Sequence, residues 1–380
     1  MTPTPPPGRR RPARRMLGAL AVALPLLGLI ELGARLSWRL HLGLGVFDAS
    51  HDADAFYKDL PLVRRVAPSG RDTIIDLLLL GGSTLHNDYG AIQALLLERL
   101  TSMTRRRVRV FNLGMPAHTS RDSYFKYRAL AGLGFDLVIL YDGVNEVRAN
   151  NVPPALFRDD YSHYAWYQLV NDVLDRHRLR PLATPYTLLH LSRELAERRA
   201  ARTGHRRTVP PDDLGSIWTE YGGAIRTAAP FRHNVEATLD LAAARGDPAI
   251  VMTYAYYLAP GYTAAAFRDR QLDYARHRSP IALWGRPANV TAGIDAHNTV
   301  IRGIHAARPD VGFVDMAAAI PHSRVFFDDA CHLTIAGSAR FVDALLPVIF
   351  AQLDTTLTHV TRPPSGAPRP PAPAARHRAA

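Results

Sequence analysis

Residues Ile74 to Leu80 read IIDLLLL and are followed directly by Gly81, Gly82 and Ser83. A run this short and this continuously apolar is typical of a strand buried on both faces, the kind found in parallel sheets. The segment after it repeats apolar residues on one helix face, at Ile92, Leu95, Leu96, Leu100 and Met103. The stretch therefore predicts a buried strand, a tight glycine turn and a helix packed on the sheet.

The same alternation of apolar runs and helix-period segments continues along the chain. It predicts further strands at residues 108–112, 136–141, 249–254 and 312–315. It predicts further helices at residues 120–133, 292–307 and 334–353. Five parallel strands with intervening helices form a doubly wound, flavodoxin-like α/β fold, so we expect a three-layer α/β/α sandwich.

More than a hundred residues, about 143–248, separate the third and fourth predicted strands. Because ordinary connections are far shorter, we expect a long, partly helical insertion at about residues 147–245, lying beside the strand ends. It contains a charged run at residues 197–207, which is typical of a solvated face, and an aromatic cluster, which is more often core than ligand platform: Tyr161, Tyr164, Trp166 and Tyr167.

The N-terminal residues have the features of a membrane anchor. Residues 1–15 hold five arginines and no acid, and Met16 to Ile30 hold no charge at all. A helix over residues 16–38 would be about 35 Å long, enough to cross a bilayer. The positive-inside rule places the basic end in the cytoplasm and the remainder in the periplasm or outside the cell. A cleaved signal peptide is the alternative, but the small-x-small triplets at residues 19–23 lie inside the apolar run, which favours an uncleaved signal anchor.

Composition narrows the remaining classes. With 47% hydrophobic residues the chain can bury a sizeable core, whereas the Pro/Ala/Arg-rich residues 361–380 are predicted to be disordered. The net charge of +12 falls to +3 once the arginines of residues 1–15 and 361–380 are set apart, so the body offers no basic face for nucleic acid. The single cysteine, Cys331, excludes a Cys-rich structural metal site.

Polar residues follow the predicted strands at their carboxyl ends, where open parallel sheets bind ligands. Ser83 follows the first strand, Gly114 the second and Asn145 the third, while Asp329 and His332 precede the last predicted helix. Taken singly, Ser83 reads as a helix N-cap, and the glycine and asparagine as turn or cap residues. Their order along one sheet edge instead predicts a shared site.

The residue types at this edge suit nucleophilic catalysis. A serine hydroxyl needs a base, which His332 can supply, and Asp329 three residues earlier can accept a hydrogen bond from the imidazole Nδ1. Acyl transfer also needs donors for an oxyanion, and the backbone N–H groups of Ser83 and Gly114 and the amide of Asn145 are the candidates. Such chemistry requires no cofactor and no metal.

These blocks, in this order, resemble those of the SGNH hydrolase superfamily, also called GDSL-type esterases and lipases. The resemblance covers about residues 74–353 without the insertion, and implies a hydrolase domain at about 70–355. It identifies Ser83 as nucleophile, Gly114 and Asn145 as oxyanion residues, and Asp329 and His332 as triad partners. Gly82 stands where many members have Asp, and Glu146 where Asp is common, which marks a divergent, membrane-anchored branch with a Gly-Gly-Ser start.

The predicted function is a serine esterase or acyl hydrolase that forms an acyl-enzyme. Its expected partners are the membrane and an ester-bearing small molecule, glycan or lipid, for example one carrying O-acetyl groups in the cell envelope. Two alternatives stay open. An O-acyltransferase would pass the acyl group from the same site to an envelope polysaccharide, and a non-catalytic envelope binding protein would keep the pocket without turnover.

Other polar residues near the site have ordinary explanations. A hard-metal site can be drawn, but the chain has no compact ligand motif that would support it; its members would be Asp142, Glu146, Asp328, Asp329 and His332. His86 and His118 follow the first two blocks and could line the pocket, but we expect them to be exposed loop residues. Cys331 is expected to be structural and to point away from the Ser83 side of the base.

Overall fold

The computed structural model describes residues 11–66, 68, 74–104, 106–176, 182–204, 208–209 and 218–359. Residues 1–10, the tail 361–380 and the end of the charged run at 205–207 lie outside the described residues, as do the side chains of Arg11, Arg14 and Arg15. The predictions of a basic cytoplasmic end and a disordered tail therefore stay predictions.

The core of the protein is a five-stranded parallel sheet, as the sequence predicted. Its strand order is β2-β1-β3-β4-β5, so β1 lies between β2 and β3. The strands are β1 (Ile74–Gly81), β2 (Arg107–Asn112), β3 (Leu137–Tyr141), β4 (Ala249–Met252) and β5 (Gly312–Val314). The last two are shorter at their carboxyl ends than the sequence patterns predicted.

Strand β1 shows why the apolar run decides the fold. Leu77 and Leu79 pack into the core on one face of the sheet, whereas Leu78 and Leu80 pack into the core on the other. Burying one leucine contributes roughly 1.5 to 3 kcal/mol. The one charged side chain of the strand, Asp76, is buried and forms a 2.6 Å ion pair with Arg109 of β2.

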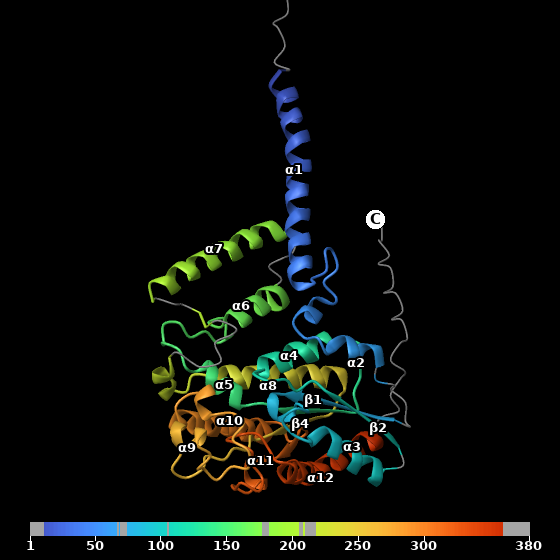
Figure 1. Cartoon of the computed structure of the whole chain (residues 1–380). Helices are drawn as coiled ribbons and strands as arrows, with labels where there is room; N and C mark the ends of the chain where they lie inside the picture. The colour runs from blue at the N-terminus through green and yellow to red at the C-terminus, as the bar shows by residue number, and fades with distance from the viewer. Residues whose placement is uncertain are drawn as a thin grey trace, which may run out of the picture.

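Helices cover both faces of the sheet and complete the predicted three layers (Figure 1). One face carries α3 (Ile92–Met103) and α12 (Ile335–His359), which pack against each other. The other carries α4 (Ser120–Ala129) and α8 (Ala228–Arg245), and α10 (Pro287–Ala307) packs against α8.

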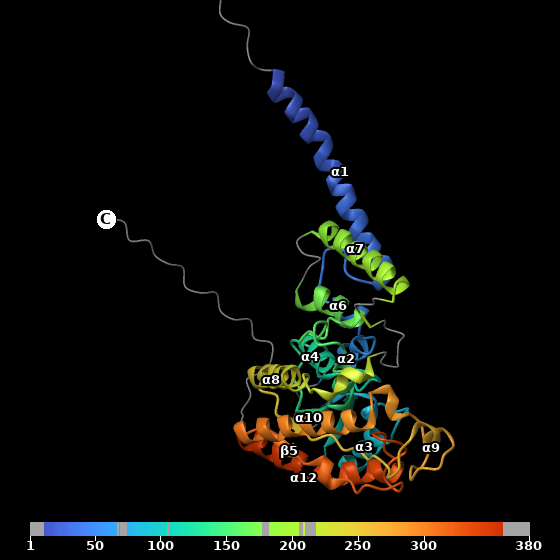
Figure 2. The same cartoon turned by 90° about the vertical axis from the view of Figure 1, so that its left-hand side faces the viewer.

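The segment between β3 and β4 has two parts. Helix α8 packs on α4 and α10, so it is the crossover helix of the sandwich although it falls within the insertion predicted at about 147–245. The preceding elements are α5 (Val144–Ala149), α6 (Ala165–Val170), the π-helical turn η3 (Asn171–Asp175), α7 (Ala183–Arg202) and the turn η4 (Thr219–Gly223). Of these, α5 and η4 pack against α10, whereas α6 and α7 lie between the sandwich and the N-terminal helix (Figure 2).

The remaining elements are short and lie in loops. They are η1 (Asp52–Ala55), α2 (Leu60–Val66), η2 (Ser83–Leu85), α9 (Ala264–Arg268), η5 (Ile281–Leu283) and α11 (Met316–Ala319). Two of them, α9 and η5, belong to a long connection from β4 to α10 that no sequence pattern singled out. This connection brings several side chains to the site described below.

The N-terminal helix α1 (Arg11–Leu42) projects from the sandwich (Figure 1). Its part from Met16 to Leu42 is long and apolar enough to cross a membrane, and none of its most apolar stretch is buried by the rest of the chain. A second helical segment, Ile335–Leu353, meets the same length and composition test, but it belongs to α12 and packs against the sheet.

Candidate active site

Ser83 lies where β1 ends, at the start of the short turn η2. Gly82 immediately before it is extended, and a Cβ atom at this position would lie 2.8 Å from Nδ2 of Asn145. Because real Cβ atoms do not approach other atoms so closely, the glycine allows the asparagine side chain to lie directly beside the serine backbone. The absence of a Cβ atom at Gly82 thus makes room for the close packing of Asn145.

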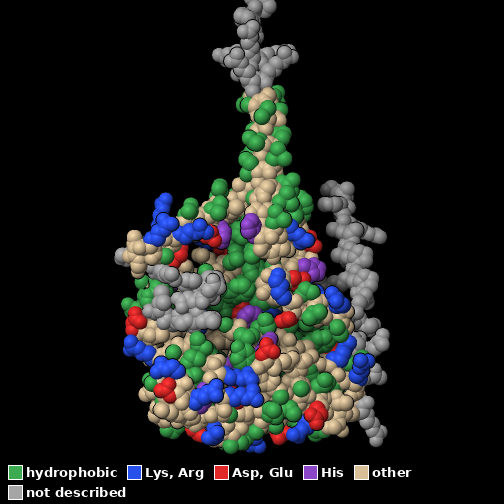
Figure 3. Space-filling view, viewed as in Figure 1, with side chains coloured by type: hydrophobic (Ala, Val, Ile, Leu, Met, Phe, Trp, Pro, Cys, Tyr) green, Lys and Arg blue, Asp and Glu red, His purple; other side chains and the backbone are tan. Residues whose placement is uncertain are grey.

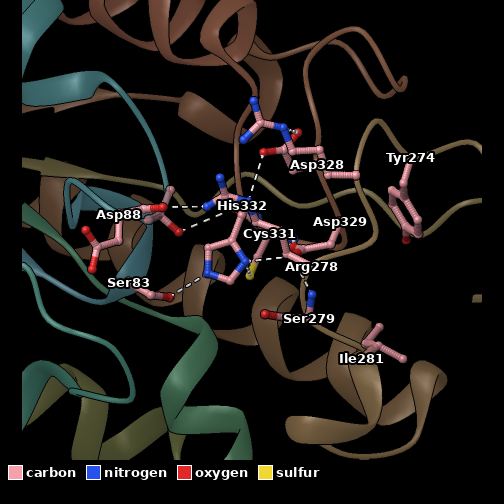
Figure 4. A network of polar contacts seen from close by, with 12 residues as sticks. Ser83, Asp88, Tyr274, Arg278, Ser279, Ile281, Asp328, Asp329, Cys331 and His332 are labelled. Carbon is pink, nitrogen blue, oxygen red and sulfur yellow. Dashed lines mark hydrogen bonds and ion pairs between the residues drawn. The ribbon is translucent and has the colours of Figure 1, made fainter. Parts of the chain in front are cut away.

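A continuous chain of hydrogen bonds joins Ser83, His332 and Asp329 (Figure 4). The distance from Ser83 Oγ to His332 Nε2 is 2.8 Å, and the distance from His332 Nδ1 to Asp329 Oδ2 is 2.7 Å. All three side chains are buried. The structure therefore brings together three residues that lie up to 249 positions apart in the sequence.

The carboxylate of Asp329 decides the tautomer of the histidine. A carboxylate only accepts hydrogen bonds, so Nδ1 of His332 carries the proton and donates it to Asp329. Nε2 is then free of a proton and accepts the Ser83 hydroxyl. This is the arrangement in which the imidazole can act as a general base toward the serine.

Asp329 is itself held by three backbone N–H groups. Its Oδ1 accepts hydrogen bonds from the backbone nitrogens of Cys331 and His332, at 3.0 and 2.9 Å. Its Oδ2 accepts a third from the backbone nitrogen of Ser279, at 2.9 Å. The aspartate thus closes its own turn, and the loop from β4 to α10 fixes the oxygen that faces the imidazole.

Asn145, at the start of α5, has a fixed amide orientation. Its Nδ2 donates to the carbonyl of His118 at 2.7 Å, and its Oδ1 accepts from the indole nitrogen of Trp284 at 2.9 Å. One hydrogen on Nδ2 is used by the first bond. The second has no acceptor among the described residues, so it is available for an oxyanion next to Gly82 and Ser83.

Gly114 occupies the turn after β2, and its N–H already has an acceptor. It donates to Oδ1 of Asn112 at 2.9 Å, and the Asn112 amide donates to the carbonyl of Leu85 at 2.6 Å. The buried ammonium of Lys126 donates to the carbonyl of Leu113 at 2.6 Å, and burial lowers the pKa of Lys126 to about 8. The turn is therefore held from both sides, with the Gly114 N–H engaged inside it.

Two aromatic residues near the triad were not predicted from the sequence. The ring of Tyr89 stacks on His332 with centroids 4.3 Å apart, and the guanidinium of Arg278 lies over the Tyr89 ring, 5.7 Å from its centroid. Trp284 holds Asn145, as described above. Isolated aromatic residues in loops carry no periodic signal, so only their spatial neighbours reveal them.

The structure assigns different surroundings to the remaining candidates. Cys331 is buried with Sγ 3.8 Å from His332 Nδ1, on the side of the ring opposite Ser83, and burial raises the pKa of its thiol well above the usual value. His86 lies in the loop after η2, partly exposed. His118 is not an exposed loop residue as predicted, because it packs against Trp166 and burial lowers its pKa to about 4.

A cavity of about 220 Å³ lies next to Asn145 and His118. Part of the predicted aromatic cluster forms its wall: Tyr164, Trp166 and Tyr167 line it, while the same side chains pack into a small core with Tyr161. The cluster is therefore both core and cavity wall. Asp122 fixes this wall, since it accepts hydrogen bonds from the Tyr167 hydroxyl and the Trp166 indole.

The acidic residues that suggested a metal site are arranged differently. Among the described residues, the His, Cys, Asp and Glu side chains close enough together to hold an ion are Asp329, Cys331 and His332, two of which belong to the triad. Asp142 and Glu146 are instead fully buried side by side, and burial raises the pKa of both carboxyls. Oε1 of Glu146 accepts a hydrogen bond from the backbone nitrogen of Ser120.

Glu146→Gln is expected to change how stability depends on pH. Burial raises the pKa of Glu146 from 4.5 to about 7, so in that interval the unfolded chain loses a proton that the folded chain keeps. The native protein then loses stability as pH rises through this interval, by an amount of order 1 to 3 kcal/mol. Glutamine keeps an oxygen for Ser120 and removes the titration. The difference in melting temperature between the variant and the native chain should therefore be more in favour of the variant at pH 8 than at pH 4.5.

The exposed Glu98→Gln provides the control for this prediction, because a surface carboxyl contributes little to such a difference. A shift in melting temperature for Glu146→Gln that is the same at both pH values would contradict the prediction.

Solved structures with a similar fold include three esterases or lipases. A GDSL-like lipase from Bacteroides thetaiotaomicron is 12% identical, with a TM-score of 0.44 over 78% of this chain and 97% of that one. A lipase/acylhydrolase from Enterococcus faecalis is 14% identical, with a TM-score of 0.38 over 73% and 96% of the two chains. The acetylxylan esterase Axe2 from Geobacillus stearothermophilus is 14% identical, with a TM-score of 0.38 over 72% and 94%.

At these identities the similarity extends to the fold alone. No protein-family model matches the chain, and no curated protein matches it by sequence. What the protein does must therefore be argued from its own residues.

Proposed function

We propose that this protein is a membrane-anchored serine esterase or acyl hydrolase of the SGNH type. The observation that carries the proposal is the buried chain of hydrogen bonds from Ser83 through His332 to Asp329 at the carboxyl edge of the sheet. The amide of Asn145 beside Gly82 supports it, since acyl transfer needs a donor at that place.

The first half of the proposed reaction acylates the serine. His332 Nε2 takes the proton of the Ser83 hydroxyl as Oγ attacks the ester carbonyl, and Asp329 stabilises the imidazolium that forms. The tetrahedral intermediate then collapses. The carbon–oxygen bond to the alcohol breaks, His332 gives its proton to the departing oxygen, and the acyl group stays on Ser83.

Donors around Ser83 stabilise the negative oxygen of the intermediate. The second Nδ2 hydrogen of Asn145 and the backbone N–H of Ser83 are the proposed donors, and the N–H of Gly114 joins them when its bond to Asn112 is shared or released. Loss of one such donor typically costs about 2.7 to 4 kcal/mol of transition-state stabilisation.

In the second half, water replaces the alcohol. His332 removes a proton from a water molecule that attacks the acyl carbon, and the returning proton restores the Ser83 hydroxyl as the carboxylic acid leaves. Apart from the substrate and water, every group in the proposed reaction belongs to the chain itself, and the reaction needs no cofactor.

Asn145 connects the cavity to the proposed site, since it lines the cavity, whereas neither Ser83 nor His332 is among the lining residues. Ligand pockets usually measure about 300 to 1,000 Å³, and this cavity of about 220 Å³ is smaller. We propose that the site takes a short acyl group such as acetyl, carried by a carbohydrate or lipid of the cell envelope. The cavity wall combines aromatic side chains with polar ones, among them Thr119, Asn145 and Arg148.

Helix α1 is the proposed membrane anchor, with the hydrolase domain in the periplasm or outside the cell. The exposed apolar length from Met16 to Leu42 and the arginines of residues 1–15 support this orientation.

Labelling with a fluorophosphonate tests the proposed function. The full chain in detergent is treated with the reagent, digested and examined by mass spectrometry, with His332→Ala as the matched variant that keeps the serine but removes its base. We expect an adduct on the Ser83 peptide of the native chain and none on that of the variant. A folded native chain without adduct would instead favour a non-catalytic binding protein.

A second measurement separates a hydrolase from an acyltransferase. With an acetyl ester as substrate, release of free acetate identifies a hydrolase, whereas acetyl appearing on an added polysaccharide identifies an acyltransferase.

A further inference from the structure

Helix α7 is joined to α1 by a charged cap. The carboxylate of Glu31 accepts hydrogen bonds from the backbone nitrogens of Ala183 and Thr184, at 2.7 and 2.9 Å, and from the Thr184 hydroxyl at 2.9 Å. Arg35, one turn further along α1, forms a 2.7 Å ion pair with the same carboxylate. An acid at a helix N-terminus satisfies the unpaired N–H groups there, so Glu31 fixes the start of α7 to α1.

A second contact fixes the direction of α7. The indole of Trp38 donates to the Thr187 hydroxyl at 2.8 Å, and its ring stacks on Tyr186 with centroids 5.3 Å apart. His190, one turn further along α7, meets the same indole edge to face at 5.1 Å. The two helices therefore form one unit over two turns of each.

The opposite face of α7 is apolar and exposed. Leu188, Leu191 and Leu195 are 63%, 49% and 55% exposed. They continue into two exposed arginines, Arg199 and Arg202, at steps of three and four residues, so all five side chains lie along one helix face. The inward face is different, since Tyr186 is buried and Arg193 forms an ion pair with the buried Asp172.

With α1 as the proposed anchor, α7 meets α1 near the end of the membrane-spanning part. At 1.5 Å per residue, Glu31 and Trp38 lie about 22 and 33 Å along the helix from Met16, and the hydrocarbon core of a bilayer is about 30 Å thick. Figure 1 shows α7 extending sideways from the lower part of the projecting α1, and Figure 3 shows hydrophobic side chains along α1 with basic side chains near the outer end of α7. A helix in this position lies at the level where α1 leaves the lipid.

We propose that α7 is an interfacial helix whose partner is the bilayer surface from which α1 emerges. Leu188, Leu191 and Leu195 enter the boundary between headgroups and acyl chains, and Arg199 and Arg202 lie at the phosphates of anionic lipids. This inference rests on the proposed membrane anchor. It assigns α7, together with α1, the task of fixing the orientation of the sandwich against the bilayer.

Spin labelling of the full chain in vesicles containing anionic phospholipid tests the proposal. Single cysteines are placed at Leu191, at Ala196 on the exposed flank of the same helix and at Val22 in α1, and each is labelled with a nitroxide. The native chain, whose Cys331 is buried, controls for background labelling. Collisions with oxygen, which concentrates in lipid, and with a nickel chelate, which stays in water, then report the position of each label.

We expect the ratio of oxygen collisions to nickel collisions to be several-fold higher for the Leu191 label than for the Ala196 label. The ratio should be higher still for the Val22 label, which lies deeper in the lipid. Equal ratios at Leu191 and Ala196, together with a lipid-exposed Val22 label, would overturn the interfacial placement of α7 and leave the anchor standing. Spectral broadening between labels at Leu191 would show that a second copy covers this face, which also overturns it. A water-exposed Val22 label would refute the anchor and the inference together.

Discussion

Replacing Ser83 by alanine is expected to lower kcat/KM for a p-nitrophenyl acetate substrate by roughly 10⁴- to 10⁶-fold. The substitution removes the oxygen that lies 2.8 Å from His332 Nε2, and no second hydroxyl of the described residues is bonded to that nitrogen. Any remaining rate would come from oxyanion donors and substrate binding alone, with water as nucleophile. Steady-state hydrolysis by the full chain in detergent measures the effect.

The control for this prediction is Ser102→Ala. The Ser102 side chain is exposed on α3 and donates a hydrogen bond within its own helix, to the carbonyl of Arg99. Its removal should leave hydrolysis unchanged. A Ser83→Ala variant that folds and keeps more than a tenth of native activity would show that this serine is not the nucleophile.

Asp329→Asn is expected to reduce kcat by roughly 10⁴-fold while the protein stays folded. The side-chain oxygen of asparagine can still accept from the backbone nitrogens of Cys331 and His332. Its amide nitrogen then faces His332 Nδ1 and the N–H of Ser279. Because an amide N–H donates, Nδ1 must accept, and the imidazole proton moves to Nε2, where it faces Ser83 and blocks general-base catalysis.

Asp328→Asn is the matched control, one residue earlier in the same turn. Asp328 forms longer ion pairs with Arg276 and Arg278, at 3.7 and 3.4 Å, and does not bond the imidazole (Figure 4). We expect its loss to change kcat far less than the loss of Asp329 does. Equal effects of the two substitutions would mean that the turn as a whole, and not the carboxylate beside Nδ1, supports activity.

The layers of the fold were predictable because they depend on local pattern. The run IIDLLLL alternates its leucines between two cores, and this requires helices on both faces of β1. The helix periods at residues 92–103 and 334–353 then identify two of those helices. Helix α8 was harder to assign, since nothing in its own pattern separates a sandwich helix from one in an insertion; its packing on α4 and α10 does.

The candidate site was predictable in part for a related reason. Parallel strands end at one edge, so residues that follow different strands can be expected to meet, and the structure brings Ser83, Asp329 and His332 within hydrogen-bonding distance. Their catalytic roles stay predictions. The hydrogen bond of the Gly114 N–H could not be predicted. Its acceptor is the side chain of Asn112, two residues away, and only the folded turn fixes the orientation of that side chain.

By itself, then, the sequence determined the strands, the helix periods, the apolar N-terminal segment and the polar residues at the strand ends, because each of these is a property of neighbours in the chain. Only the tertiary structure decided which distant groups meet. The Tyr89 ring on His332, the Trp284 indole on Asn145 and the Glu31 cap on α7 each join segments with no pattern in common. Such contacts arise when the packing of the whole core sets side chains at bonding distance, and no local periodicity encodes them.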